Sequence, residues 1–214
     1  MNNTEQQTKH DVEQELSWDP SVHAEGIGVS MKNGVVQLDG HVSSFYEKWA
    51  AERAALRIAN VKAVASEIEV ELPSMFERTD ASIAETAANR LSHIIPETVK
   101  VMVANGWVSL QGSVPERHHW MNAEAIVRTL PGVKGITNEI TLEPRPIASD
   151  VKAKIENALK RNAQIDASQI TVSVDGSRIK LKGKVRSWLE REEAENAAFA
   201  APGVMGVENY IIIQ

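Results

Sequence analysis

The chain contains no cysteine, which excludes disulfides, thiolate metal sites and cysteine nucleophiles. It also lacks a run of about 18 or more apolar residues, the length that a membrane-spanning helix needs. The polar start Met1-Asn2-Asn3-Thr4 does not have the basic and then apolar layout of a signal peptide, and there is no lipobox cysteine. We therefore expect a cytoplasmic protein, with the periphery of the inner membrane as a further option.

Several kinds of functional signal are also missing. The net charge of −6 argues against bulk binding of nucleic acid, which usually needs a basic domain. The chain has no Walker loop, no G-x-S-x-G and no H-E-x-x-H motif. His118 and His119 follow Glu116, but adjacent residues on a helix point about 100° apart, which does not suit chelation of one ion. We expect no catalytic residues, no metal site and no cofactor.

The main feature that is present is a threefold internal repeat. Each copy contains a short apolar segment that ends in an anchor glycine, at Gly40, Gly112 and Gly183, and these glycines are expected to be structural. The anchors lie 72 and 71 residues apart, and the residues after them align without a gap. Matching positions include Val42, Val114 and Val185, and later Ile68, Ile140 and Ile211.

The hydrophobic periodicity changes in the same order within each repeat. A helical spacing such as Ile83, Ala87 and Leu91 comes first, followed by a strand, an Asn-Gly or Asp-Gly turn and the strand that ends at the anchor. A second helix with small buried residues and an alternating strand close the repeat. We predict an α+β fold of three tandem αββαβ modules, each a two-layer sandwich with a three-stranded mixed sheet packed on two helices.

Ser-x-x-Glu pairs resemble capping boxes and predict where some helices start. These pairs are Ser44/Glu47, Ser82/Glu85 and Ser187/Glu190. The predicted repeats span residues 8–72, 79–143 and 148–214. Because the links at 73–78 and 143–147 are short, and the second is rich in proline, we expect units fixed against one another rather than loosely tethered.

The repeat resembles the BON domain, named for bacterial osmotically induced and nodulation proteins. The resemblance rests on the αββαβ order, on a V-x-L-x-G-x-V signature at 36–42, 108–114 and 179–185, and on a G-V-x-x-V element at 132–136 and 203–207. It covers nearly the whole chain. It implies a transport-associated or envelope-supporting module that interacts with phospholipids, several members being linked to osmotic stress, and it implies no enzymatic activity.

The third repeat carries cations at every second position of its central strand. They are Arg178, Lys180, Lys182, Lys184 and Arg186. Because strand side chains alternate between faces, all five are expected on the side away from the helices. The charge also differs between repeats, with −5 for residues 8–72, −1 for 73–147 and +1 for 148–214. Three readings stay open: a solubilising surface or one that docks on the acidic first repeat, a site for anionic lipid, and a site for nucleic acid or another polyanion.

Tryptophan recurs near the start of the second helix, at Trp49, Trp120 and Trp188. Tryptophan is enriched at interfaces, including the headgroup zone of membranes, but packing between neighbouring modules is the simpler interpretation. The three offsets from the anchor glycine are 9, 8 and 5 residues, and we therefore expect that the rings do not share one direction.

Together these patterns predict a non-catalytic binding protein. The main hypothesis is peripheral interaction with anionic phospholipid surfaces through the basic strand of the third repeat. The alternative is a cytoplasmic scaffold whose modules bind protein or each other. No nucleic acid is expected as a partner, and the sequence leaves open which lipid or protein is bound, how the modules are oriented and the oligomeric state.

Overall fold

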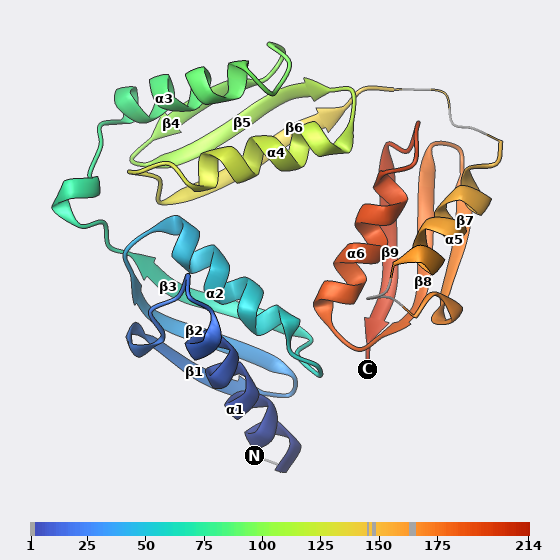
Figure 1. Ribbon diagram of the computed structural model, residues 1–214, viewed down its shortest axis with the longest axis horizontal. Helices are drawn as coiled ribbons and strands as arrows, with labels where there is room; N and C mark the ends of the chain where they lie inside the picture. The colour runs from blue at the N-terminus through green and yellow to red at the C-terminus, as the bar shows by residue number, and fades with distance from the viewer. Residues whose placement is uncertain (1–2, 145, 147–148, 163–165) are drawn as a thin grey trace.

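The computed structural model shows three separate three-stranded sheets, each with two helices, along the chain (Figure 1). The structure describes residues 3–144, 146, 149–162 and 166–214. The order of the main elements is αββαβ in every unit, as the sequence predicts. In the described part of the chain, no helix combines the length and the apolar character needed to cross a bilayer.

The elements are as follows. Unit one consists of α1 (Asn3–Trp18), β1 (Ile27–Lys32), β2 (Val35–Val42), α2 (Phe45–Arg57) and β3 (Ala63–Val70). Unit two consists of α3 (Asp80–Ser92), β4 (Lys100–Ala104), β5 (Trp107–Val114), α4 (Arg117–Arg128) and β6 (Gly135–Leu142). Unit three consists of α5 (Val151–Arg161), β7 (Ile170–Asp175), β8 (Arg178–Val185), α6 (Trp188–Phe199) and β9 (Gly206–Ile213). Short 3₁₀ helices are η1 (Ala24–Gly26), η2 (Ser74–Phe76) and η3 (Ala167–Gln169).

Each sheet is mixed, because its middle strand pairs antiparallel with the first strand and parallel with the last. The antiparallel pair is a hairpin, whereas the parallel pair is joined by the second helix, as a parallel connection requires. The middle strand alternates between buried and exposed residues; in β2, for example, Val36 and Leu38 are fully buried. One face of each sheet therefore packs on the helices and the other faces away from them. We call the second one the outer face.

Each unit has its own hydrophobic core between sheet and helices. The second helix contributes small residues, such as Ala51 and Ala54 in unit one and Ala194 and Ala198 in unit three, all fully buried. Small side chains let this helix lie close to the sheet. The bulkier core side chains come from the strands and from the first helix.

The anchor glycines are needed because the strand passes close to the preceding loop. Gly40, Gly112 and Gly183 have φ values of 124°, 137° and 153°, which L-residues rarely adopt. A Cβ at these positions would overlap a backbone carbonyl oxygen, that of Gly26, Thr98 or Gln169 respectively. Both the conformation and the space therefore require glycine.

The hairpin turns differ between units. In units one and two both turn residues, Asn33-Gly34 and Asn105-Gly106, have positive φ, as type I′ turns require. In unit three Asp175 still belongs to β7, and the two-residue loop is Gly176-Ser177, with positive φ only at the glycine. That is the pattern of a type II′ turn, and it accommodates the one extra residue that the third copy has between its Asp-Gly pair and its anchor glycine.

Helix starts follow the capping predictions in two cases of three. Ser44 and Ser187 are the N-caps of α2 and α6, and each hydroxyl accepts a hydrogen bond from the amide of the glutamate three residues later. The prediction at Ser82/Glu85 is wrong. The N-cap of α3 is Thr79, whose hydroxyl accepts from the Ser82 amide at 3.3 Å, so the helix starts one turn earlier.

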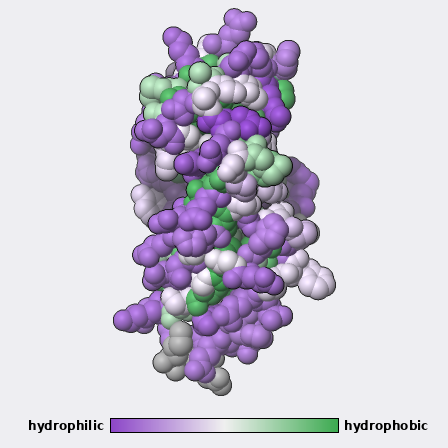
Figure 2. Space-filling view, turned by 90° about the vertical axis from the view of Figure 1, so that its left-hand side faces the viewer, coloured by the Kyte–Doolittle hydropathy of each residue, from purple (hydrophilic) through white to green (hydrophobic). Residues whose placement is uncertain are grey.

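The three units surround a common centre, toward which α2, α4 and α6 are turned (Figure 1). Helices α2 and α6, from units one and three, pack against each other although they are far apart in the sequence. The link between units one and two contains η2, whereas Arg145, Ile147 and Ala148 lie outside the described residues, so the predicted proline-rich link is described only in part. The side of the molecule shown in Figure 2 is mainly hydrophilic, with only small hydrophobic areas.

Candidate functional site

A central cavity of about 630 Å³ lies between the three second helices. Each helix contributes one tryptophan to its lining, namely Trp49, Trp120 and Trp188. All three side chains are partly buried. The cavity exists only because three units meet, so it belongs to the whole chain rather than to any one repeat.

The expectation that the three tryptophans do not share a direction is wrong. Their offsets from the anchor glycine, 5, 8 and 9 residues, correspond to positions i, i+3 and i+4 of equivalent helices. Such positions lie on the same helical face. All three side chains therefore share a helical face and line the same cavity, while Trp49 and Trp120 also pack against the cores of their own units.

Arginine side chains connect the units around this cavity. Arg128 of α4 stacks on Trp49 of α2, with its guanidinium carbon 3.9 Å from the ring centroid. Arg117 of α4 lies over Phe199 of α6 at 4.5 Å, and also over Trp120 at 3.9 Å. These contacts join unit two to units one and three.

The third connection is an ion pair between Arg53 of α2 and Glu192 of α6. Each pair of units is thus joined by an arginine from a second helix. Burial lowers the pKa of Arg117 and that of Arg53, although Glu195 and Glu124 raise the first and Glu193 raises the second. Both groups remain cationic at neutral pH, because the ordinary arginine pKa is far above it.

The residues that line the cavity therefore have a structural role, which is to connect the three units. Its tryptophan faces are covered by arginines, with Arg191 over Trp188 at 4.8 Å as the third example. Its arginines face glutamates of neighbouring helices. Cation–π contacts of this kind are worth about 0.5 to 2 kcal/mol each.

The predicted cations of the third repeat lie mostly on the outer face of sheet three, and we call Arg178, Lys180, Lys182, Lys184 and Arg186 the basic face. Ile179, Leu181 and Val185, which alternate with them, are buried. Arg186 lies beyond the end of β8, and its guanidinium donates to Glu190 of α6 at 2.9 Å. Because Arg186 is not part of β8, the alternation of side chains along the strand does not align it with the other four cations.

Part of the basic face is neutralised within unit three. Lys180 lies 2.8 Å from Asp175 and 3.9 Å from Glu208, and Arg178 lies 3.7 Å from Glu208. The hydrogen bond with Asp175 raises the pKa of Lys180 and lowers that of Asp175. Lys182 and Lys184 are exposed, and neither forms an ion pair with any described residue.

The two unpaired lysines have exposed apolar neighbours. Strand β9 places Tyr210 beside Lys182 and Ile212 beside Lys184 in the parallel register. Tyr210 is 57% exposed and Ile212 is 52% exposed. The Lys182 ammonium lies 5.9 Å from the centroid of the Tyr210 ring. This end of the basic face combines free positive charge with an aromatic and an aliphatic side chain.

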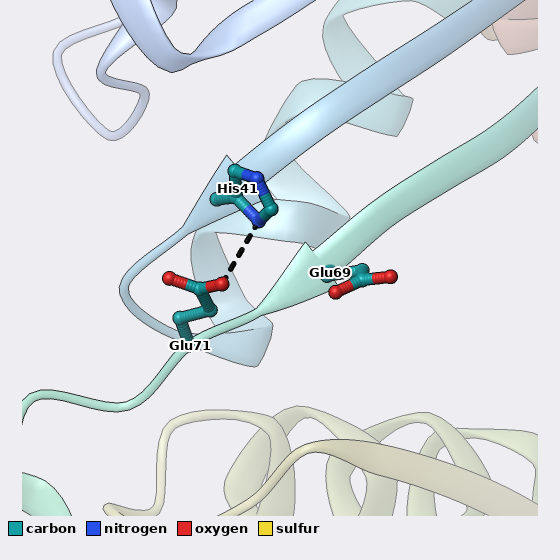
Figure 3. A group of neighbouring side chains, drawn as sticks. All are labelled: His41, Glu69 and Glu71. Atoms are coloured by element: carbon teal, nitrogen blue, oxygen red, sulfur yellow. Dashed lines mark ion pairs between the residues drawn. The ribbon is translucent and has the colours of Figure 1, made fainter.

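The outer face of sheet one has the opposite charge, and we call Asp39, Glu67, Glu69 and Glu71 the acidic face. His41 lies among these carboxylates, 3.1 Å from Glu71 (Figure 3). His41, Glu69 and Glu71 each have a potential metal-ligand atom within 4.8 Å of the others, an arrangement that sequence spacing does not reveal because two strands build it. All three side chains are exposed, and we treat them as part of the acidic face.

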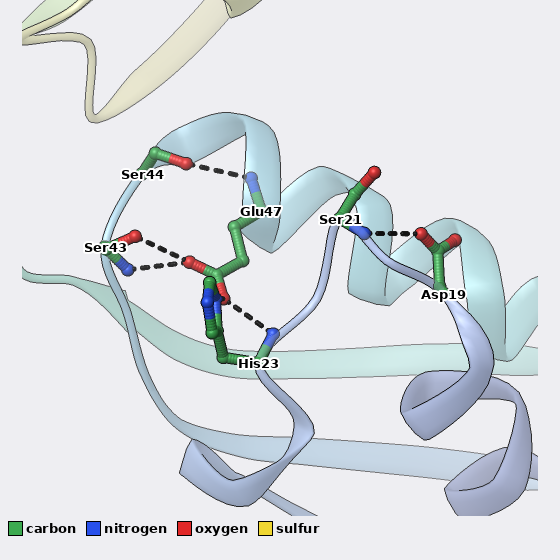
Figure 4. A network of polar contacts seen from close by, with 6 residues as sticks. All are labelled: Asp19, Ser21, His23, Ser43, Ser44 and Glu47. Atoms are coloured by element: carbon green, nitrogen blue, oxygen red, sulfur yellow. Dashed lines mark hydrogen bonds and ion pairs between the residues drawn. The ribbon is translucent and has the colours of Figure 1, made fainter.

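A buried glutamate organises the start of α2 (Figure 4). Glu47 is 4% exposed and accepts hydrogen bonds from the amides of His23 and Ser43, both at 2.9 Å. Its carboxylate also lies 2.7 Å from His23 Nδ1 and accepts from the Ser43 hydroxyl. Burial raises the pKa of Glu47, but these hydrogen bonds outweigh it and leave that pKa below its ordinary value. In unit three Glu190 takes the same position and accepts from the Arg186 amide.

Comparison with known proteins agrees with the repeat. The model of the BON domain family matches three times, at residues 4–71, 79–144 and 148–214. No curated protein matches the chain. Among solved structures, the C-terminal domain of CdsD, the structural protein of the type III secretion system of Chlamydia trachomatis, is similar, with 15% identity over 96% of each chain and a TM-score of 0.27.

A second CdsD structure matches with 14% identity over 96% of this chain and 91% of that one, again with a TM-score of 0.27. Likeness at this level carries no argument about function. The family match, in contrast, covers nearly the whole chain in three consecutive copies. The chain belongs to the BON domain family, a family of non-enzymatic binding modules.

Proposed function

We propose that this protein binds anionic phospholipid surfaces peripherally, through the basic face of unit three. The observation that carries the proposal is a pair of exposed lysines, Lys182 and Lys184, which form no ion pair within the described part of the chain. They lie beside exposed Tyr210 and Ile212. Lysine near an anionic membrane contributes about 1 kcal/mol. Tyrosine is enriched where a membrane meets water, because one end of its ring is apolar and the other is polar.

The internal ion pairs divide the basic face into two parts. Lys180 and Arg178 already face Asp175 and Glu208, so a headgroup would have to compete with those carboxylates. Lys182 and Lys184 have no such competitor among the residues that the structure describes. We therefore assign the main contribution to these two lysines and a smaller one to Arg178, Lys180 and Arg186.

We further propose that the protein is not an enzyme. Enzymes often place buried carboxylates with altered pKa values at a reactive centre. Here the buried Glu47 and Glu190 hold the start of a helix, and each accepts hydrogen bonds from backbone amides and from side chains just before it or nearby. Their surroundings explain their burial without any reaction.

The alternative function is that of a protein-interaction scaffold, in which the modules bind a partner or one another. The observation in its favour is that arginines of the second helices join the units around the central cavity, which the three tryptophans line. An osmotic-stress or envelope-maintenance role, which comes from the family resemblance alone, remains part of the proposal, as does a cytoplasmic location with the periphery of the inner membrane as a further option.

The test is sedimentation with vesicles of phosphatidylcholine alone or with phosphatidylglycerol, using the full chain and Lys182→Glu/Lys184→Glu. Loss of two lysines worth about 1 kcal/mol each predicts that the variant binds anionic vesicles at least about 30-fold more weakly. The matched control is Lys100→Glu/Lys134→Glu, which makes the same charge change at exposed positions of unit two and should bind like the wild type. Equal loss in both variants would show that only net charge matters, and would overturn the assignment of the site.

A further inference from the structure

We infer that the acidic face of one copy of this chain docks on the basic face of a second copy. This inference goes beyond membrane binding and does not depend on it. It rests on two outer sheet faces of opposite charge that are carried by the same polypeptide.

The acidic face carries charge that the molecule itself does not neutralise. Asp39, Glu67 and Glu69 are exposed, and none forms an ion pair with a described residue. Asp39 and Glu67 are direct partners in the register of β2 and β3. Like charges directly opposite each other on neighbouring strands are destabilising. An external cation placed on this face would relieve that repulsion.

The basic face offers the complementary charge on the same scaffold. Asp39 and Lys182 occupy equivalent positions, each directly before the anchor glycine of its repeat. The two sheets have the same strand order and matching registers, so the two faces present side chains at equivalent backbone positions while their free charges differ in sign. Exposed Tyr210 and Ile212 would add apolar contact beside the charges.

Within one molecule these two faces are not paired with each other. The ion pairs of the basic face among described residues all lie within unit three, with Asp175, Glu208 and Glu190. Units one and three instead meet through their helices, at Arg53 and Glu192. The complementary charges are thus left for another molecule, and a second copy supplies both faces. Such a contact joins different surfaces, so it either closes into a small assembly or continues into a longer one.

The inference has a functional consequence, because Lys182 and Lys184 would serve both contacts. A second copy seated on the basic face would mask the lysines from an anionic membrane. Self-association and vesicle binding would then compete.

The experiment is sedimentation velocity of the full chain over a range of concentrations, without lipid and with EDTA, so that no metal ion at His41 bridges two copies. One variant, Glu67→Lys/Glu69→Lys, makes both faces basic, and the other, Lys182→Glu/Lys184→Glu, makes both acidic. The wild type is expected to self-associate at low ionic strength. Association should be lost near about 1 M salt, where the Debye length is about 3 Å.

Each variant alone is expected to self-associate at least about tenfold more weakly, since like faces now meet. An equimolar mixture of the two variants should associate again, which also shows that both are folded. The control Lys100→Glu/Lys134→Glu should behave like the wild type. A wild type that stays monomeric at low salt, or a mixture that fails to associate, would overturn the inference. The Glu67→Lys/Glu69→Lys variant keeps Lys182 and Lys184 and should still bind anionic vesicles. Failure of this inference can therefore be distinguished from failure of the membrane proposal.

Discussion

At the scale of single residues, the position seven residues after the anchor glycine shows how one side chain organises a helix start. Glu47 and Glu190 fill it in units one and three, and both carboxylates accept from the backbone just before the helix. In unit two the same position is His119, and α4 has no side-chain hydrogen bond at its N-cap. The repeat therefore keeps its fold although unit two has no glutamate at this position.

Glu47 leads to a prediction about acid stability. Its folded pKa is below the ordinary value, so its stabilising effect is complete above the ordinary glutamate pKa and is lost as the pH falls through the folded pKa. Glu47→Gln should lower the free energy of unfolding at neutral pH by about 1 to 3 kcal/mol. Urea unfolding between about pH 7 and pH 3 should show a weaker loss of stability on acidification in the variant than in the wild type. Glu69→Gln, at an exposed site, is the control, and an unchanged pH dependence in Glu47→Gln would contradict this account.

At the scale of elements, much of the fold could be predicted from the sequence. The anchor glycines, the Asn-Gly turns and the alternation in the central strands identify the strands, because each depends on local geometry. The capping pairs identified α2 and α6 for the same reason. The prediction at Ser82 failed because Thr79, one turn earlier, offers an equivalent hydroxyl.

The site was harder to predict than the fold. The common helical face of the tryptophans follows from helical geometry, because offsets of 5, 8 and 9 residues lie about one turn apart although they differ as numbers. The partners of Lys180 and Arg178 come from two other strands, so no sequence spacing indicates them. The contacts of Arg117 and Arg128 depend on how whole units are oriented, which local patterns do not encode.

The weak start of α4 gives a prediction for an element. Its N-cap is Glu116, in the position that serine occupies in α2 and α6. Glu116→Ser should supply the missing hydroxyl acceptor and raise the free energy of unfolding by about 0.5 to 1 kcal/mol. Thermal unfolding should show a higher midpoint than in Glu97→Ser, an exposed control outside any helix. A midpoint equal to or below that of the wild type would show that the cap is not what α4 lacks.

At the scale of the whole molecule, arginines of the second helices hold three small units around one centre. Arg128 on Trp49, Arg117 on Phe199 and the Arg53–Glu192 ion pair connect all three pairs of units. This arrangement leaves the outer faces of the sheets available for other partners. The acidic and basic faces are thus displayed by one body rather than by loosely tethered modules.

The arrangement of units can be tested by removing two of these contacts at once. Trp49→Ala/Arg53→Ala should increase the radius of gyration in small-angle X-ray scattering, because unit one loses its stacking contact with Arg128 of unit two and its ion pair with unit three. The helix content seen by circular dichroism should stay the same, since each unit has its own core. Trp18→Ala, at a ring that is 85% exposed, is the control. An unchanged radius would mean that these side chains do not hold the units together.

The most direct test of the central claim is vesicle flotation of the unmodified chain, compared between zwitterionic and phosphatidylglycerol-containing bilayers at increasing salt. The account predicts binding only to the anionic vesicles, weakening steeply as salt screens the lysines. Absence of binding to either vesicle at low salt, or equal binding to both, would contradict the claim that the basic face recognises an anionic membrane surface.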